Sequence, residues 1–278
     1  LHVAINPETA KALIDGGADI HAKAKDGNEA IHSLVGENML DSVKYLLSLG
    51  VDVDAYGKNN MTPLHQAAVF NHIDGAELLI MNGADIKAVD DNGMTCLHFS
   101  RSEGMTKYLI SKGANINASA KDKTTPLHFA SNKLIASLLI NNGANLAAKD
   151  SDGATALHWA VSSRDDVSRV LIDAGAPINA KDASGSTPLD FALNDLKAFL
   201  VDRGAKLGRE LVLLNYNLTN RELVISGMAG SIYELQYSSN LKKWYALANI
   251  TMKNNATVYL HNTPQNSSRR FYRLKLLD

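Results

Sequence analysis

The feature that most limits the possible folds of this chain is a repeat. A histidine preceded by leucine or isoleucine recurs at intervals of 30 to 33 residues. Self-similarity at this period is typical of stacked arrays, because one small unit cannot bury its own apolar face and must pack on its neighbours. The recurring histidines are His2, His32, His65, His98, His128 and His158, and Asp190 stands at the same point of a further unit.

Each unit predicts a pair of short helices. Around His65, Thr62 is a good N-cap, and Pro63 suits the first helical turn, where its missing N–H costs nothing. Residues 76–80 carry a second apolar stripe, and Gly83 stands where a left-handed C-cap ends the second helix. The polar segment that follows contains Asp, Asn and Gly and predicts a turn before the next threonine.

The repeat resembles the ankyrin repeat over residues 1–206. The segments that carry the resemblance are GANINA (113–118), GAPINA (175–180), DSDGATALHWA (150–160) and GSTPLDFA (185–192). The resemblance implies an α solenoid of about seven units, the first of them incomplete. In such a solenoid, antiparallel helix pairs alternate with hairpin loops, and the concave face binds other proteins.

Several units depart from this pattern. His98 and His128 each lie 15 positions before the glycine that ends the second helix, as does His2, whereas the distance is 18 at His32 and His65. Three residues are therefore missing between the helices of the shorter units. Because an α-helix has about 3.6 residues per turn, removing three residues keeps the apolar seam nearly in register. We therefore expect helix pairs shortened by about one turn, with a recessed edge away from the hairpins. The first unit also lacks Thr-Pro, from which we expect Leu1 to be a cut end.

A row of histidines could bind metal ions or take part in catalysis. Stacked helices lie about 8–10 Å apart, whereas two histidine ligands of one zinc ion bring their nitrogen atoms within about 4 Å. Catalysis would need one pocket with a partner group, and this histidine recurs in one environment instead. By resemblance to ankyrin repeats, the six histidines are structural and hydrogen-bond the hairpin backbone and the threonine of their own unit.

Aromatic residues follow the histidine position in consecutive units. Such a row could form a binding stripe, although packing between units is the favoured interpretation. The residues are Phe99, Phe129, Trp159 and Phe191.

The period stops at about residue 207, and the pattern becomes that of strands. Tyr233, Leu235 and Tyr237 alternate with polar residues, as in a strand with one buried face. We expect residues 207–278 to form a small antiparallel all-β sandwich of about six strands. The expected strands are 210–214, 221–226, 232–238, 245–252, 257–261 and 270–277.

A second resemblance lies in this C-terminal region. The segments YELQYSSNLKKW (233–244) and RFYR (270–273) resemble a small β-sandwich module at the end of secreted bacterial multidomain proteins. It implies a secreted or cell-surface location, and a cytoplasmic location is the alternative. Residues 1–206 carry a net charge of −6 and residues 207–278 a net charge of +5, so the two parts differ in electrostatic character.

Composition and motifs exclude several function classes. The net charge of −1 gives no whole-chain case for binding nucleic acid. No stretch of sequence approaches the roughly 20 consecutive apolar residues of a membrane-spanning helix. Cys96 is the only cysteine, which excludes an internal disulfide and a CxxC site. We find no GxGxxG, P-loop, GxSxG or HExxH motif, and we expect a monomer without catalytic residues, metal or cofactor.

The sequence and the first resemblance together predict a non-catalytic scaffold whose concave face binds another protein. The residues expected to form this face are chemically mixed, which suits the binding of a protein surface better than the binding of a single small ligand. By alignment, the hairpin tips are Asn28, Asn59, Met61, Asp91, Met94, Lys121, Thr124, Asp152, Ala154, Ser184 and Ser186. The first-helix face would consist of Val69, Phe70, Arg101, Ser131, Asn132, Ser162 and Ser163.

Two other functions stay open. The array could be the binding arm of a larger enzyme whose catalytic part precedes Leu1. Alternatively, residues 207–278 could attach to carbohydrate or to a cell surface while the array acts as a spacer.

Overall fold

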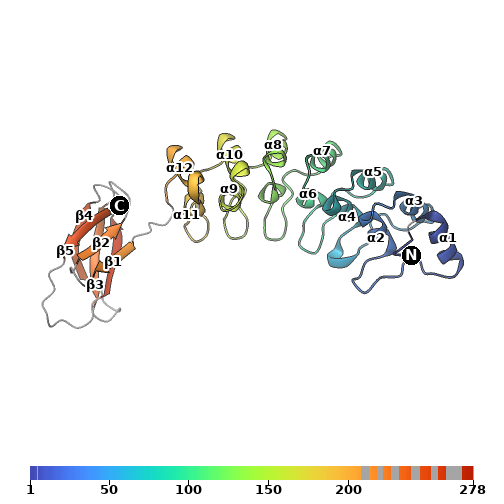
Figure 1. Ribbon diagram of the computed structural model, residues 1–278, viewed down its shortest axis with the longest axis horizontal. Coiled ribbons are helices and arrows are strands. Elements are labelled where there is room, and N and C mark those ends of the chain that lie inside the picture. The colour runs from blue at the N-terminus through green and yellow to red at the C-terminus, as the bar shows by residue number, and fades with distance from the viewer. Residues whose placement is uncertain are drawn as a thin grey trace. The chain divides into compact units, whose positions relative to one another are not determined.

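The chain divides into two compact units, Leu1–Lys206 and Leu207–Asp278. The computed structural model describes residues 1–4 and 6–207, and beyond them the backbone of six strands. In the first unit, the helices form two rows, with α5, α7, α8, α10 and α12 in one row and α4, α6, α9 and α11 in the other (Figure 1). Among the described residues, no helix is both long and apolar enough to cross a lipid bilayer.

The helices fall into two classes that alternate along the chain. The second helix of each unit has nine residues wherever it is described: α1 (Pro7–Asp15), α3 (Leu40–Ser48), α5 (Ile73–Met81), α7 (Glu103–Ser111), α8 (Lys133–Asn141), α10 (Asp165–Asp173) and α12 (Asn194–Asp202). The first helices are α2 (Ala30–Gly36), α4 (Pro63–Phe70), α6 (Cys96–Phe99), the 3₁₀ helix η2 (Pro126–Phe129), α9 (Ala156–Ala160) and α11 (Pro188–Phe191). A further 3₁₀ turn, η1 (Lys58–Asn60), lies in one hairpin.

The signals read from the sequence set the ends of these helices. Thr62 caps α4 in a capping box with His65, and Pro63 occupies the first turn. The same box begins the later first helices, and Glu29 takes the place of threonine at α2. Gly83 has a φ of +90° just after α5, the left-handed conformation predicted for a helix end.

The missing residues shorten only the first helix of a pair. Helix α4 has eight residues, whereas α6 and η2 have four each, and the second helices keep nine. The reason lies in where each helix buries its side chains. Helix α7 buries Met105 and Leu109, four positions apart, and so needs more than one turn, whereas α6 buries Cys96, Leu97 and His98 within its single turn.

The core of the first unit is a continuous stack of aliphatic side chains. The leucine of each Thr-x-Leu segment is buried, as expected where neighbouring units cover a face that one helix pair would leave exposed. The largest fully buried side chains are Ile31, Leu34, Leu46, Leu64, Leu79, Leu97, Met105, Leu109, Leu127, Ile135 and Leu139.

The second unit contains two antiparallel sheets of three strands each. One sheet has the order β1-β2-β5 and the other the order β4-β3-β6. The packing of these sheets into a sandwich depends on side chains outside the described residues and stays a prediction. The strands are β1 (Leu213–Asn217), β2 (Glu222–Ser226), β3 (Ile232–Ser238), β4 (Tyr245–Thr251), β5 (Ala256–Leu260) and β6 (Phe271–Leu277).

Candidate functional site

The recurring histidines link each unit to the next. The Nδ1 atom of His65 accepts hydrogen bonds from the Thr62 backbone N–H, at 3.1 Å, and from the Thr62 hydroxyl, at 2.9 Å. The Nε2 atom of the same ring donates to the Met94 carbonyl of the following hairpin, at 3.1 Å. Because a carbonyl only accepts, the proton of this neutral ring sits on Nε2. The hydrogen bonds implied by the resemblance are therefore present.

The same geometry repeats along the array. In each unit the acceptor is the carbonyl of the residue just before the next helix cap, at 2.9 to 3.4 Å. Burial lowers the pKa of five of these rings below the ordinary histidine value, because the charged form loses its hydration. The five are His32, His65, His98, His128 and His158. The acceptors are Asn28, Met61, Met94, Thr124, Ala154 and Ser186.

In the four units that begin with threonine and carry this histidine, both ring nitrogen atoms form hydrogen bonds within the array. Within residues 1–4 and 6–207, no group of three or more His, Cys, Asp or Glu side chains could hold a metal ion. Burial also raises the pKa of Cys96 to about 12, so its thiol stays protonated at neutral pH.

The aromatic row packs between units. Phe99 meets the edge of His65 with ring centroids 5.8 Å apart, and Trp159 meets His128 in the same way. Phe129 and Trp159 also contact each other, at 5.4 Å. Phe191 at the end of the row is the most exposed member, at 43%. The row thus packs between units, which is the interpretation that the sequence analysis favoured. The last member of the row is partly open to solvent.

The hairpin tips divide into exposed and buried positions. Asn59, Asp91, Lys121, Asp152 and Ser184 are exposed, and Asn28, Met61, Met94 and Ala154 are half-buried. Thr124 and Ser186 are buried, contrary to the expectation that they face a partner. Their hydroxyls turn back into their own hairpins, where that of Thr124 donates to Asp122 and that of Ser186 shares a hydrogen bond with the Ser184 hydroxyl.

The predicted first-helix face needs a correction. Val69 and Phe70 do lie on a first helix, at the end of α4, with 38% and 54% of their surface exposed. The other predicted members follow the ends of the shortened helices and lie in the connections to the second helices, because α6, η2 and α9 end earlier than expected. Those members are Arg101, Ser131, Asn132, Ser162 and Ser163, and Asn132 additionally caps α8 through its side chain.

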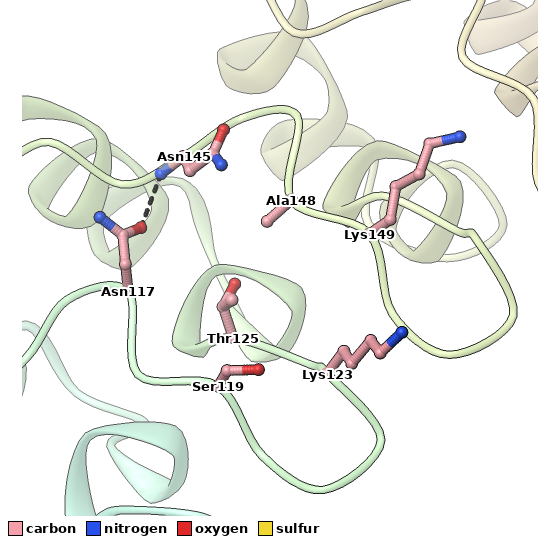
Figure 2. Close-up of a pocket in the computed structure, with 7 residues that line it drawn as sticks. All are labelled: Asn117, Ser119, Lys123, Thr125, Asn145, Ala148 and Lys149. Carbon is pink, nitrogen blue, oxygen red and sulfur yellow. Dashed lines mark hydrogen bonds between the residues drawn. The ribbon is translucent and has the colours of Figure 1, made fainter.

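A pocket that the sequence reasoning missed lies between two neighbouring hairpins. It has a volume of about 390 Å³ and is open to solvent on one side. In Figure 2 the two asparagines lie at one end of the pocket and the two lysines at the other. Its lining consists of Asn117, Ser119, Lys123 and Thr125 from one hairpin segment and Asn145, Ala148 and Lys149 from the next.

One sequence signal could have pointed to this pocket. Lys123 has a φ of +64° and stands where the other hairpins have Gly27, Asn60, Gly93, Gly153 or Gly185, all with positive φ. A lysine at that place breaks the pattern of the units, although the pattern alone does not say what the side chain faces.

Comparison with known proteins agrees with this geometry. The family described as "Ankyrin repeats (3 copies)" matches residues 1–90, 79–150 and 131–210. A solved structure of the ankyrin repeat domain of Bcl-3, described as a unique member of the IkappaB protein family, matches with a TM-score of 0.59 and 22% identity. That match covers 72% of this chain and 96% of the Bcl-3 chain, and at such identity it concerns the fold alone. No curated protein matches the sequence. Because the family match extends over residues 1–210, more than half of its length, the chain belongs to the ankyrin repeat family.

Proposed function

We propose that the first unit is a non-catalytic scaffold that binds another protein. The proposed binding surface consists of the predicted hairpin tips without the buried Thr124 and Ser186, together with Val69, Phe70 and the five residues that follow the shortened first helices. Membership of the ankyrin repeat family supports this function at the level of the class, because these repeats generally mediate contacts between proteins.

The observation that carries the proposal is the exposure of Val69 and Phe70. Both are large apolar side chains at the end of α4, and Phe70 keeps 54% of its surface in water. Covering such side chains releases about 25 cal/mol per Å² of apolar surface, so they favour a protein partner. The polar tips around them, such as Asn59 and Asp91, suit the rim of a protein interface.

We further infer a monomer whose second unit is a small β-sandwich of the kind found in secreted bacterial proteins. The two three-stranded antiparallel sheets support the sandwich, since sheets of this size need a second layer to bury an apolar face. The location outside the cell rests on the sequence resemblance of residues 233–244 and 270–273.

The test compares three forms of the full chain as baits in a lysate and in the culture medium of the source organism. One variant combines Met61→Ala, Phe70→Ala, Met94→Ala and Arg101→Ala. The matched control combines Met81→Ala, Leu134→Ala and Lys107→Ala, three exposed residues of second helices. We expect a protein that the wild type and the control retain and the first variant loses. Equal retention by all three baits would place the binding site elsewhere.

A further inference from the structure

One position of the hairpins forms a row of exposed side chains along the array. It is the position that follows the alanine at the end of segments such as GADIKA (83–88). At Ser119, for example, the neighbours Ala118 and Ala120 are buried while the serine is exposed. Because side chains of an extended segment alternate between two faces, these residues share one face of their hairpins. The row consists of Lys23, Tyr56, Val89, Ser119, Lys149 and Lys181, all of them exposed.

Hydrogen bonds between units show that members of the row are neighbours in space. The Nζ atom of Lys23 donates to the Tyr56 carbonyl, at 2.9 Å. The Nζ atom of Lys149 donates in the same way to the Lys181 carbonyl, at 2.7 Å. The hairpins follow one another along one side of the array (Figure 1). A partner could therefore lie along the row from one unit to the next.

The middle of the row is apolar and borders a pocket. Val89 keeps 46% of its surface exposed, and Tyr56, one unit earlier, keeps 52%. A pocket of about 370 Å³ lies beside Val89, and its lining includes Ile86 and Ala118. Ser119 lines this pocket and also the next one, which Figure 2 shows. The row thus offers an apolar side chain a place to leave water, which is favourable, and continues into the following unit.

The ends of the row are positively charged. Lys23 lies at one end, and Lys149 and Lys181 lie at the other. Within residues 1–4 and 6–207, none of these lysines forms an ion pair. The carboxylates of Asp150 and Asp182, which directly follow two of them, accept hydrogen bonds from backbone N–H groups of their own hairpins. The row therefore presents positive charge on an array whose residues 1–206 carry a net charge of −6.

The spacing of the units sets the spacing of the groups in a partner. Stacked helices lie about 8–10 Å apart and an extended chain advances about 3.3 Å per residue, so one unit corresponds to about three residues of an extended partner. Lys149 and Lys181 stand two and three units after Val89. Their counterparts in the partner would follow the residue at Val89 by about six and about nine positions.

We propose that this row binds an extended segment of a partner protein, with apolar side chains at Tyr56 and Val89 and acidic side chains at Lys149 and Lys181. The inference rests on the proposed function, because it takes the array to be a protein-binding scaffold, and it adds the class of partner. Burial of the apolar side chains favours association, and the complementary charges fix the register of the segment. None of the row residues belongs to the binding surface proposed above, so the two proposals can fail separately.

The test titrates a labelled, blocked peptide with the full chain and follows fluorescence anisotropy. The peptide consists of serine and threonine except at four positions, spaced by about three residues per unit. Two leucines match Tyr56 and Val89, and two glutamates match Lys149 and Lys181. Because the row does not fix the direction of the partner chain, the reversed sequence is titrated as well. We expect saturable binding of at least one direction, and its absence in both would overturn the proposal.

Control peptides separate the two kinds of contact. Replacing both glutamates by glutamine should raise the Kd about fivefold, a typical loss for exposed charge contacts, and should abolish most of the weakening by salt. Replacing both leucines by serine should raise the Kd about tenfold or more, because the apolar side chains supply most of the affinity. Equal binding of all three peptides would contradict an apolar and acidic partner.

Variants of the chain locate the peptide on the row. We expect Val89→Ser to raise the Kd about tenfold and Lys181→Gln about threefold. Leu134→Ser and Lys107→Gln change the same kinds of exposed residue on α8 and α7 and should leave the Kd within about twofold. Thermal unfolding checks that the four variants are folded. Equal weakening by the row variants and their controls would overturn the assignment to the row.

The fourfold alanine variant of the scaffold test separates this row from the surface proposed above. We expect that variant to bind the peptide nearly as tightly as the wild type while it loses the lysate partner. Loss of peptide binding in that variant, with unchanged binding by Val89→Ser, would place the peptide on the earlier surface and overturn the row. A lysate partner retained by the fourfold variant would instead remove the earlier surface, and the peptide titrations would still decide about the row.

Discussion

Lys123 adopts a backbone conformation that glycine adopts at lower cost. At its φ of +64°, we expect Lys123→Gly to raise the free energy of unfolding by about 1 kcal/mol, less than the full strain because glycine also loosens the unfolded chain. Denaturant unfolding at pH 7 measures the change. Lys121→Gly is the control, since Lys121 has an ordinary negative φ and should lose about 0.5–1 kcal/mol instead. If both variants are destabilised, the backbone at Lys123 is not strained.

Glu29 is an unusual cap for a first helix. Its Oε2 atom is buried without a hydrogen-bond partner among the described residues and lies 3.6 Å from the Nδ1 atom of His21. The other capping boxes of the array have threonine, which satisfies the same backbone N–H without a second buried oxygen. We expect Glu29→Thr to stabilise the chain by about 1 kcal/mol in thermal or denaturant unfolding. A loss of stability would show that the interactions of the Glu29 carboxylate stabilise the fold by more than the burial of its unpaired oxygen destabilises it.

At the scale of single residues, the sequence predicted the positions that recur. The role of His65 follows from its repetition, because a group present in every unit serves what every unit needs. The burial of Thr124 and Ser186 was missed, because the repeat pattern does not show that their hydroxyls bond to Asp122 and Ser184 within their own hairpins.

At the scale of elements, the shortened helix η2 is completed from the next unit. Arg164, at the start of α10, donates from Nη1 to the carbonyls of His128 and Ala130, at 3.1 and 2.9 Å. These carbonyls lie at the end of η2, where a longer helix would have satisfied them. The sequence predicted the missing turn but not this replacement, because the arginine follows 34 to 36 positions later.

We therefore expect Arg164→Ala to lower the free energy of unfolding by about 1–2 kcal/mol. The value is below that of a fully buried charged hydrogen bond because the side chain of Arg164 is half-buried. Arg101→Ala, an exposed arginine of the preceding connection, serves as control and should change stability by less than about 0.5 kcal/mol. Arg164→Lys should recover only part of the loss, since an ammonium group does not reproduce the planar guanidinium. Equal effects at both arginines would argue against a capping role.

At the scale of the whole molecule, the buried histidines make the array sensitive to acid. Burial lowers the pKa values of the five recurring histidines His32, His65, His98, His128 and His158. Protonation of Nδ1 would remove the acceptor of a backbone N–H. The unfolded chain therefore binds more protons than the folded chain below about pH 6.5, and stability is lost as pH falls below that value. The lowered pKa values of Asp122 and Asp182 act in a separate window, below their ordinary value of 3.8.

Denaturant unfolding between pH 7.5 and pH 5 tests this dependence. We expect constant stability down to about pH 6.5 and then a decline, to which each histidine adds up to about 1.4 kcal/mol per pH unit. His158→Asp copies the last unit, where Asp190 accepts from Thr187, and should reduce the slope by the share of one histidine. Because the five rings lie in successive units from the second to the sixth, a stability independent of pH over this range would mean that none of them is held neutral by the stack.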